Sequence, residues 1–592
     1  MGNTGITQTK KKGREATVRQ GVSRIRMLSL LIFFIGLAVF GRLYFLQIIS
    51  HDKWVALAET QHNASTELAA DRGEIYIHDG ENGRYPLAVN RDYKMVYVVP
   101  KDIVEKDTVA LRLAQALGID ATVVRDKLNG PDDPFEIIKK HLSDDEVNRV
   151  TDLHLKGVGL LPEKYRYYPG GELASQVVGF ASLGERGGAG GYGIEASFDE
   201  ALRGQTGTVL QEKDASGRWI PLSDRAVTKA EDGESLLLTL DRVIQYETEK
   251  ILKDSVERYQ ADRATAIVMD PKTGNILSMA SYPQFDPNNY SKVDDYSLFL
   301  NPAVSVTYEP GSIMKPITMA MGIEEAKVNP NTEFVDSGAI KEADYTIKNS
   351  EEKVYGRVNM NTVLEQSINT GAIYVEKLLG NHLFGDYLRR FGFGERTGMG
   401  LPAELAGTLR SLANERATIN FFTASFGQGI TATPLQLVTA YAALANGGHL
   451  MRPNIIDSII HTDGSKEKTL PEEIRRVISD ETSRTLGQML RRVVVYGHGK
   501  RADVPGYLVG GKTGTAQVAK TDGKGYQANV SIGSFVGYAP IEDPRFVVLV
   551  KLENPKNVEW AESSAAPTFG QIMKFLLEYA RIKPTESTKA GA

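Results

Sequence analysis

The chain has 592 residues, too many for a single hydrophobic core, so it is expected to fold as two or more units. Its net charge of -5 gives no support to nucleic-acid binding, and its ordinary apolar and charged fractions, 42% and 24%, exclude wholesale disorder. Cysteine is absent, which excludes disulfides and cysteine-based metal sites or nucleophiles.

The N-terminal segment predicts a membrane anchor. A cluster of Lys and Arg within residues 1–26 precedes the apolar run Met27–Ile49. At about 1.5 Å per residue, this run is long enough to cross a hydrocarbon core of about 30 Å. The cations orient the first 26 residues to the cytoplasm and everything after about residue 50 to the outside. A cleaved signal peptide is the alternative, with Ala56–Ala58 as its cleavage site, but that site lies far beyond the apolar run.

Residues 50–230 are predicted to form a mixed α+β region. A glycine-dense segment, Gly187–Gly193, is predicted to be a flexible loop and not a phosphate cradle, because no Lys-Ser/Thr follows it. Periodicity predicts a strand at Lys94–Pro100 and helices at Thr108–Leu117, ending at Gly118, and at Asp144–Leu153.

From about Ser235 the pattern changes to that of an α/β domain with a mainly antiparallel sheet. The first predicted elements are a strand at Leu236–Leu240, a helix at Arg242–Tyr259, and strands at Ala264–Met269 and Asn275–Ser281 joined by the turn Asp270–Gly274. The last are strands at Gly506–Val509, Thr515–Val518, Ser531–Tyr538 and Arg545–Leu552, followed by a helix at Phe569–Tyr579 and a polar tail.

The first motif with chemical meaning is Ser-x-x-Lys, which begins at Ser50, Ser312, Ser350 and Ser465. Only Ser312 follows Pro-Gly and opens an apolar helix. Positions i and i+3 share a helix face, so the amine of Lys315 can take the Ser312 proton if it is neutral. Burial and a neighbouring cation both favour a neutral lysine. For an isolated copy, a plain N-cap serine is the preferred interpretation.

Two further motifs follow in order. Ser367-Ile368-Asn369 offers a hydroxyl for proton relay and an amide for a peptide substrate. Lys-Thr-Gly occurs twice, and the copy at Lys272 lies in a predicted hairpin turn. The copy at residues 512–514 leads into a strand, where Lys512 and Thr513 can hold a carboxylate. There Gly514 leaves room for substrate, and the Thr515 N–H can complete an oxyanion hole.

In this order the three motifs resemble those of penicillin-binding proteins and serine β-lactamases. The surrounding segments resemble the class B (monofunctional) penicillin-binding proteins, from about residue 27 to 580. These segments are Gly41–Leu43 with Leu46-Gln47, Asp71–Tyr76, Gly193–Glu195, Leu202–Gly204, Tyr308–Ser312, Ser425–Gly429, Ala445–Gly448 and Gly510–Gln517. One departure is Ile77–Gly80, which stands where the family usually has Asp-Arg-Asn-Gly.

The resemblance implies an α/β (α+β) penicillin-binding transpeptidase, or serine β-lactamase-like, fold with a mainly antiparallel sheet. An elongated α+β pedestal (dimerisation) domain at 50–230 would precede the transpeptidase domain at 231–580, and a flexible tail would follow at 581–592. Leu401–Glu404 and the short link after Lys512 are most like the division-type (septal, FtsI-like) branch. The elongation branch shares every catalytic motif and stays open as the alternative.

The resemblance also implies a reaction, the cross-linking of peptidoglycan stem peptides on lipid II-derived glycan strands, which β-lactams block. Ser312 would attack the penultimate D-Ala, Lys315 would be the base, and Ser367 with Lys512 would pass a proton to the leaving D-Ala. Lys512, Thr513 and Thr515 would hold the terminal carboxylate, with Gly514 making room, and Asn369 would hold the peptide amide. No metal or organic cofactor is expected, and His51 and His498 are predicted to be surface residues.

The family relationship further implies a single-pass protein of the bacterial inner membrane. Its expected partners are a SEDS-type membrane glycosyltransferase and proteins of the division or elongation complex. Three other functions are the alternatives. A β-lactamase rarely carries such a pedestal, and a bifunctional polymerase needs a further domain for which residues 50–230 are too few. A β-lactam sensor needs a signalling domain, for which 26 cytoplasmic residues are too few.

Overall fold

The computed structural model describes residues 9–55, 63–80, 82–130, 135–182, 188–212, 226–520, 525–558 and 560–585. The chain divides into two units, one formed by residues 1–69 with 206–230 and the other by residues 70–205 with 231–592.

The first unit contains one long helix and a small sheet. Helix α1 (Thr9–Tyr44) continues as the π-helical turn η1 (Phe45–Ile49), and Ser23–Ile49 within them is long and apolar enough to cross a membrane. None of its apolar window is buried against protein, which is consistent with the predicted anchor at Met27–Ile49. The sheet has the antiparallel order β1-β8-β9, with bounds Asn63–Leu68, Gly207–Glu212 and Ala226–Thr228.

A seven-stranded sheet joins the two halves of the second unit, because β10 pairs in parallel with β2. Its path is β19-β18-β10-β2-β3-β4, with β5 also paired to β3. The bounds are β2 Ile75–Asp79, β3 Gly83–Val98, β4 Glu136–Leu142, β5 Val158–Tyr167, β10 Ser235–Asp241, β18 Ile456–Ile460 and β19 Lys466–Lys468.

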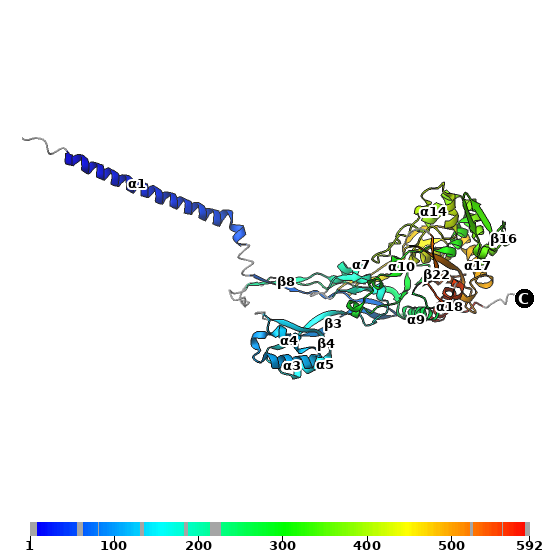
Figure 1. Ribbon diagram of the computed structural model, residues 1–592, viewed down its shortest axis with the longest axis horizontal. Helices are drawn as coiled ribbons and strands as arrows, with labels where there is room; N and C mark the ends of the chain where they lie inside the picture. Colours follow the sequence, from blue (N-terminus) through cyan, green and yellow to red (C-terminus); the bar gives the residue numbers. More distant parts are fainter. Residues whose placement is uncertain are drawn as a thin grey trace, which may run out of the picture. The chain divides into compact units, whose positions relative to one another are not determined.

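Three helices pack beside β4 into a small apolar core (Figure 1). They are α3 (Lys106–Leu117), α4 (Ala121–Leu128) and α5 (Asp144–Asp152), so both helices predicted here are confirmed. Gly118 ends α3 in the left-handed conformation, and a capping box between Ser143 and Glu146 starts α5.

The flexible loop predicted at Gly187–Gly193 is wrong from Gly190 onward, whereas Gly188 and Ala189 have no regular structure and residues 183–187 lie outside the described ranges. Gly190–Tyr192 form strand β7, which pairs with β6 (Phe180–Ala181), and Gly193 begins helix α7 (Gly193–Ser197). The glycine serves close packing, since a Cβ on Gly190 would lie 1.8 Å from the Glu195 carbonyl oxygen. Short helices α6 (Ser175–Val178) and α8 (Asp199–Arg203) complete this region.

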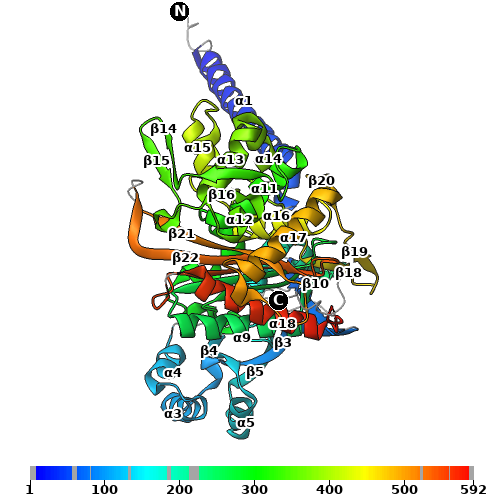
Figure 2. The same cartoon turned by 90° about the vertical axis from the view of Figure 1, so that its right-hand side faces the viewer.

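An antiparallel five-stranded sheet of order β12-β11-β23-β22-β21 forms the centre of the C-terminal half. Helices α9 (Arg242–Tyr259) and α18 (Ala565–Tyr579) cover one face (Figure 2). A larger helical group that includes α16 (Pro434–Ala445) and α17 (Asp480–Tyr496) covers the other. The strand bounds are β11 Arg263–Met269, β12 Ile276–Tyr282, β21 Gly510–Ala519, β22 Tyr526–Ala539 and β23 Phe546–Glu553.

The strand predicted at Gly506–Val509 is wrong, because β21 begins only at Gly510. The Lys-Thr-Gly motif therefore lies inside the strand and does not precede it. In the fold, a Cβ on Gly511 would lie 2.5 Å from the ring of Phe535, so this glycine lets the ring cross the strand.

The helical group and three small sheets hold the remaining elements of this half. Helix α16 is buried along its whole length, which explains its apolar sequence. The other helices are α10 Pro302–Ser305, α11 Lys315–Glu324, α12 Met360–Glu365, α13 Asn369–Leu379, α14 Asn381–Arg390, α15 Thr418–Ser425, α16 Pro434–Ala445 and α17 Asp480–Tyr496. Small sheets pair β13 (Glu333–Asp336) with β16 (Gly356–Asn359), β14 (Ala339–Glu342) with β15 (Tyr345–Lys348), and β17 (His449–Met451) with β20 (Glu473–Arg476).

Candidate active site

Ser312 lies on a rigid turn at the start of a buried helix. The 3-10 turn η5 (Gly311–Met314) runs directly into α11, and Gly311 adopts a left-handed φ of 59°. The turn is fixed from two sides: Gly311 N donates to the Gly427 carbonyl at 3.0 Å, and the buried Tyr441 hydroxyl donates to the Ile313 carbonyl at 2.7 Å. Ser312 is half-buried, and these two hydrogen bonds fix the backbone that carries its hydroxyl.

Lys315 is 1% exposed and links the Ser312 helix to the second motif. Its Nζ donates to the main-chain oxygen of Ser367 and lies 3.1 Å from Ser367 Oγ. Burial first, and then the nearby charge of Lys512, lower the pKa of Lys315 well below the ordinary lysine value. The structure therefore favours a neutral amine at this position, which is the form that can accept a proton.

The second motif occupies the junction between α12 and α13. Ser367 has a positive φ of 56°, and Asn369 donates through Nδ2 to the Lys348 carbonyl at 3.0 Å. Behind the motif, the buried Asp336 accepts a 2.6 Å hydrogen bond from the Thr370 hydroxyl and two bonds from the Asn349 amide. This carboxylate fixes the start of α13, although nothing in the sequence marked it as part of the site.

The third motif lies on β21, where alternate side chains face opposite ways. Thr513 and Thr515 line a pocket, whereas a Cβ on Gly514 would lie 2.9 Å from the Ile313 side chain, so the glycine allows the strand to lie against η5. Lys512 is 0% exposed, and its Nζ donates to the Thr513 carbonyl at 3.2 Å. Burial lowers the pKa of Lys512 to about 7, against the opposing charge of Glu562.

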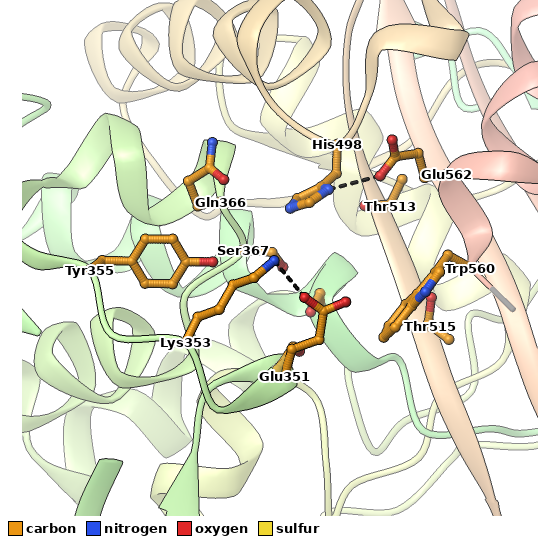
Figure 3. A pocket seen from close by; sticks show the side chains of 12 residues that line it. Glu351, Lys353, Tyr355, Gln366, Ser367, His498, Thr513, Thr515, Trp560 and Glu562 are labelled. Carbon is orange, nitrogen blue, oxygen red and sulfur yellow. Dashed lines mark hydrogen bonds and ion pairs between the residues drawn. The ribbon is translucent and has the colours of Figure 1, made fainter. Parts of the chain in front are cut away.

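The pocket at these motifs has a volume of about 170 Å³ (Figure 3). A wider groove of about 740 Å³ shares Ser312 and Thr515 with it and reaches Asn369. Neither Lys315 nor Lys512 lines the pocket or this groove, so both amines lie behind the wall. The pocket is lined by Ser312, Ser350, Glu351, Lys353, Tyr355, Gln366, Ser367, His498, Thr513, Thr515, Trp560 and Glu562.

One rejected copy of the serine motif lies at this same pocket. Ser350 and Lys353 both line it, but the Lys353 side chain is 56% exposed and pairs with Glu351 at 2.5 Å. It lacks the burial that distinguishes Lys315. The rejected Lys-Thr-Gly copy lies elsewhere, since Lys272 is exposed in the hairpin turn and pairs with Asp543.

His498 is partly exposed, as a surface residue would be, but it also lines the pocket, which the sequence did not indicate. Its side chain is 41% exposed, and its Nδ1 lies 2.8 Å from Glu562 Oε2. These partners are far apart in the sequence, and no local spacing connects them. Only the folding of η9 (Ala561–Ser563) against β21 brings them together.

Comparison with known proteins identifies the family. Residues 264–574 match the penicillin binding protein transpeptidase domain, and residues 67–238 match the penicillin-binding protein dimerisation domain. The chain is a class B penicillin-binding protein. This confirms the resemblance found in the sequence and the fold class that it implied.

Curated relatives of this penicillin-binding protein cover nearly its whole length. Stage V sporulation protein D of Bacillus subtilis is 35% identical over 575 residues, 95% of this chain and 87% of that one. Penicillin-binding protein PbpB of Mycobacterium tuberculosis is 33% identical, over 94% of this chain and 85% of that one. Peptidoglycan D,D-transpeptidase FtsI of Escherichia coli is 29% identical, over 93% and 90%.

Solved structures agree with the fold. Penicillin binding protein 3 from Mycobacterium tuberculosis, in complex with aztreonam, matches with a TM-score of 0.67 at 28% identity, covering 88% of this chain and 98% of that one. Penicillin Binding Protein 2X from Streptococcus thermophilus matches with a TM-score of 0.73 at 25% identity, covering 88% and 80%.

Proposed function

We propose that this penicillin-binding protein is a peptidoglycan D,D-transpeptidase that works through an acyl-enzyme on Ser312. The observation that carries the proposal is the buried Lys315, whose low pKa leaves an amine able to take a proton one helical turn from Ser312. Relatives named as peptidoglycan D,D-transpeptidases and a relative bound to a β-lactam support the same activity.

In the acylation step, the Ser312 hydroxyl attacks the carbonyl of the penultimate D-Ala and Lys315 takes its proton. The N–H groups of Ser312 and Thr515 stabilise the oxyanion. Ser367, which is 3.1 Å from Lys315 Nζ, and the Lys512 amine return a proton to the terminal D-Ala as it leaves.

Substrate binding uses the remaining motif residues. The amine of Lys512 and the hydroxyls of Thr513 and Thr515 hold the terminal carboxylate, and Gly514 leaves room beside it. Asn369, which lines the wider groove, holds the peptide amide. The acyl group then passes from Ser312 to an amine of a neighbouring stem, and a β-lactam blocks the enzyme by acylating the same serine.

Two identical Lys-Thr-Gly motifs offer an internal test of this function. Lys512→Ala is expected to lose D-Ala release and cross-linking of pentapeptide strands, because the substrate carboxylate loses its anchor and the leaving amine loses a proton donor. Lys272→Ala is expected to behave as wild type, since Lys272 lies in an exposed turn. Mass spectrometry of digested product measures both reactions, and equal effects of the two substitutions would contradict the assignment.

We propose the same domain boundaries and topology as the sequence predicted: a cytoplasmic tail at 1–26, an anchor at 27–49, a pedestal at 50–230, a transpeptidase domain at 231–580 outside the inner membrane, and a tail at 581–592. A septal role is favoured by Leu401–Glu404, and an elongation role is the alternative.

We further propose that the anchor and the pedestal near Asp71–Tyr76 bind a SEDS-type glycosyltransferase, because none of the domains that we assign polymerises the glycan. Small residues let membrane helices approach closely. Gly36 and Gly41 provide such open positions, since a Cβ on either meets no atom within 4 Å.

Replacing residues 27–49 with an unrelated membrane helix of equal length tests this contact. Co-purification of the glycosyltransferase and its polymerase activity are expected to fall together, because the open positions at Gly36 and Gly41 are lost. A chain with Gly36 and Gly41 restored in the foreign helix is the matched control. If both readouts are unchanged in the swapped protein, the anchor is only a tether and the pedestal alone recognises the partner.

A further inference from the structure

The wall of the pocket beside Thr513 carries a histidine that the proposed reaction does not use. His498 follows the end of α17, and its main-chain N–H donates to the Glu365 carbonyl at 3.3 Å. A Cβ on the preceding Gly497 would lie 2.4 Å from that same oxygen, so the chain lies tightly against α12, just before Ser367. The backbone of His498 is thus fixed to the second motif.

The side chain of His498 is oriented by a single partner. Nδ1 lies 2.8 Å from Glu562 Oε2, and Figure 3 shows the other ring nitrogen directed away from Glu562 into the pocket. Glu562 belongs to η9, whose Ala561 N–H donates to Thr515 Oγ1 at 3.3 Å. The pair therefore connects the second and third motifs. Both side chains are about 40% exposed, and such a pair adds little to stability.

Most of the other charged groups around the pocket are paired or buried. Glu351 and Lys353 neutralise each other on the opposite wall. The carboxylate of Glu365 on α12 forms an ion pair with Arg492, and the distance from Arg492 Nε to Glu365 Oε1 is 2.7 Å. Lys512 on β21, which the proposed function assigns to the same carboxylate, is buried behind the wall, and burial lowers its pKa to about 7. Among the described residues, both His498 and Thr513 line the pocket, and Figure 3 shows both side chains at it.

We propose that His498 is a further ligand for the carboxylate of the acylating substrate, acting beside Thr513 and Thr515, and that Glu562 is the positioning residue that aims its ring. An imidazole donates through both nitrogens only when protonated. In that form Nδ1–H donates to Glu562, and Nε2–H donates to the bound carboxylate and adds a positive charge. This proposal rests on the proposed function and adds a specificity-determining residue to it.

The test compares two acylating substrates, a thioester with a free terminal carboxylate and its neutral carboxamide. In the wild type the carboxylate form should react faster. His498→Ala is expected to slow acylation by the carboxylate form roughly 10- to 100-fold, the range for a hydrogen bond to a charged group, and to leave the carboxamide rate nearly unchanged. Glu562→Gln should reduce the preference less, because the amide still orients the ring.

Three variants make the result specific. His449→Ala removes a matched pair, with Nδ1 2.9 Å from Glu473 and outside the pocket, and should leave the preference unchanged. Lys353→Ala removes the cation of the opposite wall. If Lys353→Ala loses the preference for the carboxylate substrate and His498→Ala keeps it, the proposal is overturned. Equal slowing of both substrates in His498→Ala would also overturn the proposal. A normal acylation rate in His498→Ala, with slow transfer to an acceptor amine, would overturn it as well. Ser312→Ala distinguishes the proposed function from this role of His498. Acylation that persists in Ser312→Ala refutes the proposed function but does not refute the role of His498.

Discussion

Replacing Lys315 with alanine is expected to slow acylation of Ser312 by a penicillin about 10²- to 10⁴-fold, the usual cost of losing a general base. Burial and the charge of Lys512 hold the pKa of Lys315 well below the ordinary value, so the neutral base is available near neutral pH. Stopped-flow acylation rates across pH measure this effect. The wild-type rate should rise with pH as the amine loses its proton, and that rise should be absent from the variant.

A shape-matched substitution and a motif-matched control complete the Lys315 experiment. Lys315→Met keeps the buried volume without the amine and should lose activity as the alanine variant does. Lys468→Ala alters another Ser-x-x-Lys copy on the exposed strand β19 and should act as wild type. A normal acylation rate in Lys315→Met with an unchanged melting curve would exclude Lys315 as the base.

Arg72→Ala is expected to destabilise the second unit by about 3–5 kcal/mol, the cost of removing one partner from a buried ion pair. Arg72 is 4% exposed and lies 2.7 Å from both Glu195 and Asp199, and Arg166 contacts Glu195 from the other side at 2.6 Å. This network joins two of the family segments found in the sequence. Urea unfolding of the purified protein measures the loss, and a change below about 1 kcal/mol would contradict the account.

The same network predicts a dependence on pH. Burial raises the pKa of Glu195, but Arg166 and Arg72 outweigh that effect and hold the pKa below its ordinary value. The stabilisation is therefore complete above the unfolded-state pKa of about 4.3 and is lost as pH falls through the folded-state value. Arg72→Ala should reduce this acid-sensitive part of stability. Arg125→Ala breaks an exposed pair with Asp107 and should change stability by about 0–1 kcal/mol at any pH.

The elements that the sequence predicted well are those specified by neighbours within one or two turns. Helix α9 has the predicted bounds because Asp241 caps its start and its apolar spacing continues to Tyr259. The hairpin β11–β12 follows from two apolar runs around a turn. Ser312, too, was separable from its copies by local features, the preceding Pro-Gly and the apolar helix after it.

The features that the sequence missed are set by contacts between distant segments. His498 meets Glu562 only after η9 folds against β21, and Asp336 meets Thr370 across a small sheet and a helix start. No periodicity encodes such pairs. Gly190 was assigned to a loop for the same reason, although it allows close approach of a neighbouring segment, as Gly511 does for the Phe535 ring.

The most direct test of the central claim is the site of covalent labelling by a fluorescent penicillin, mapped by mass spectrometry of peptides. One adduct is predicted, on the peptide that contains Ser312, and it should be absent from Ser312→Ala while Ser50, Ser350 and Ser465 remain in place. Ser350 makes the test demanding, because it lines the same pocket. An adduct that persists in Ser312→Ala, on Ser350 or elsewhere, would contradict the account.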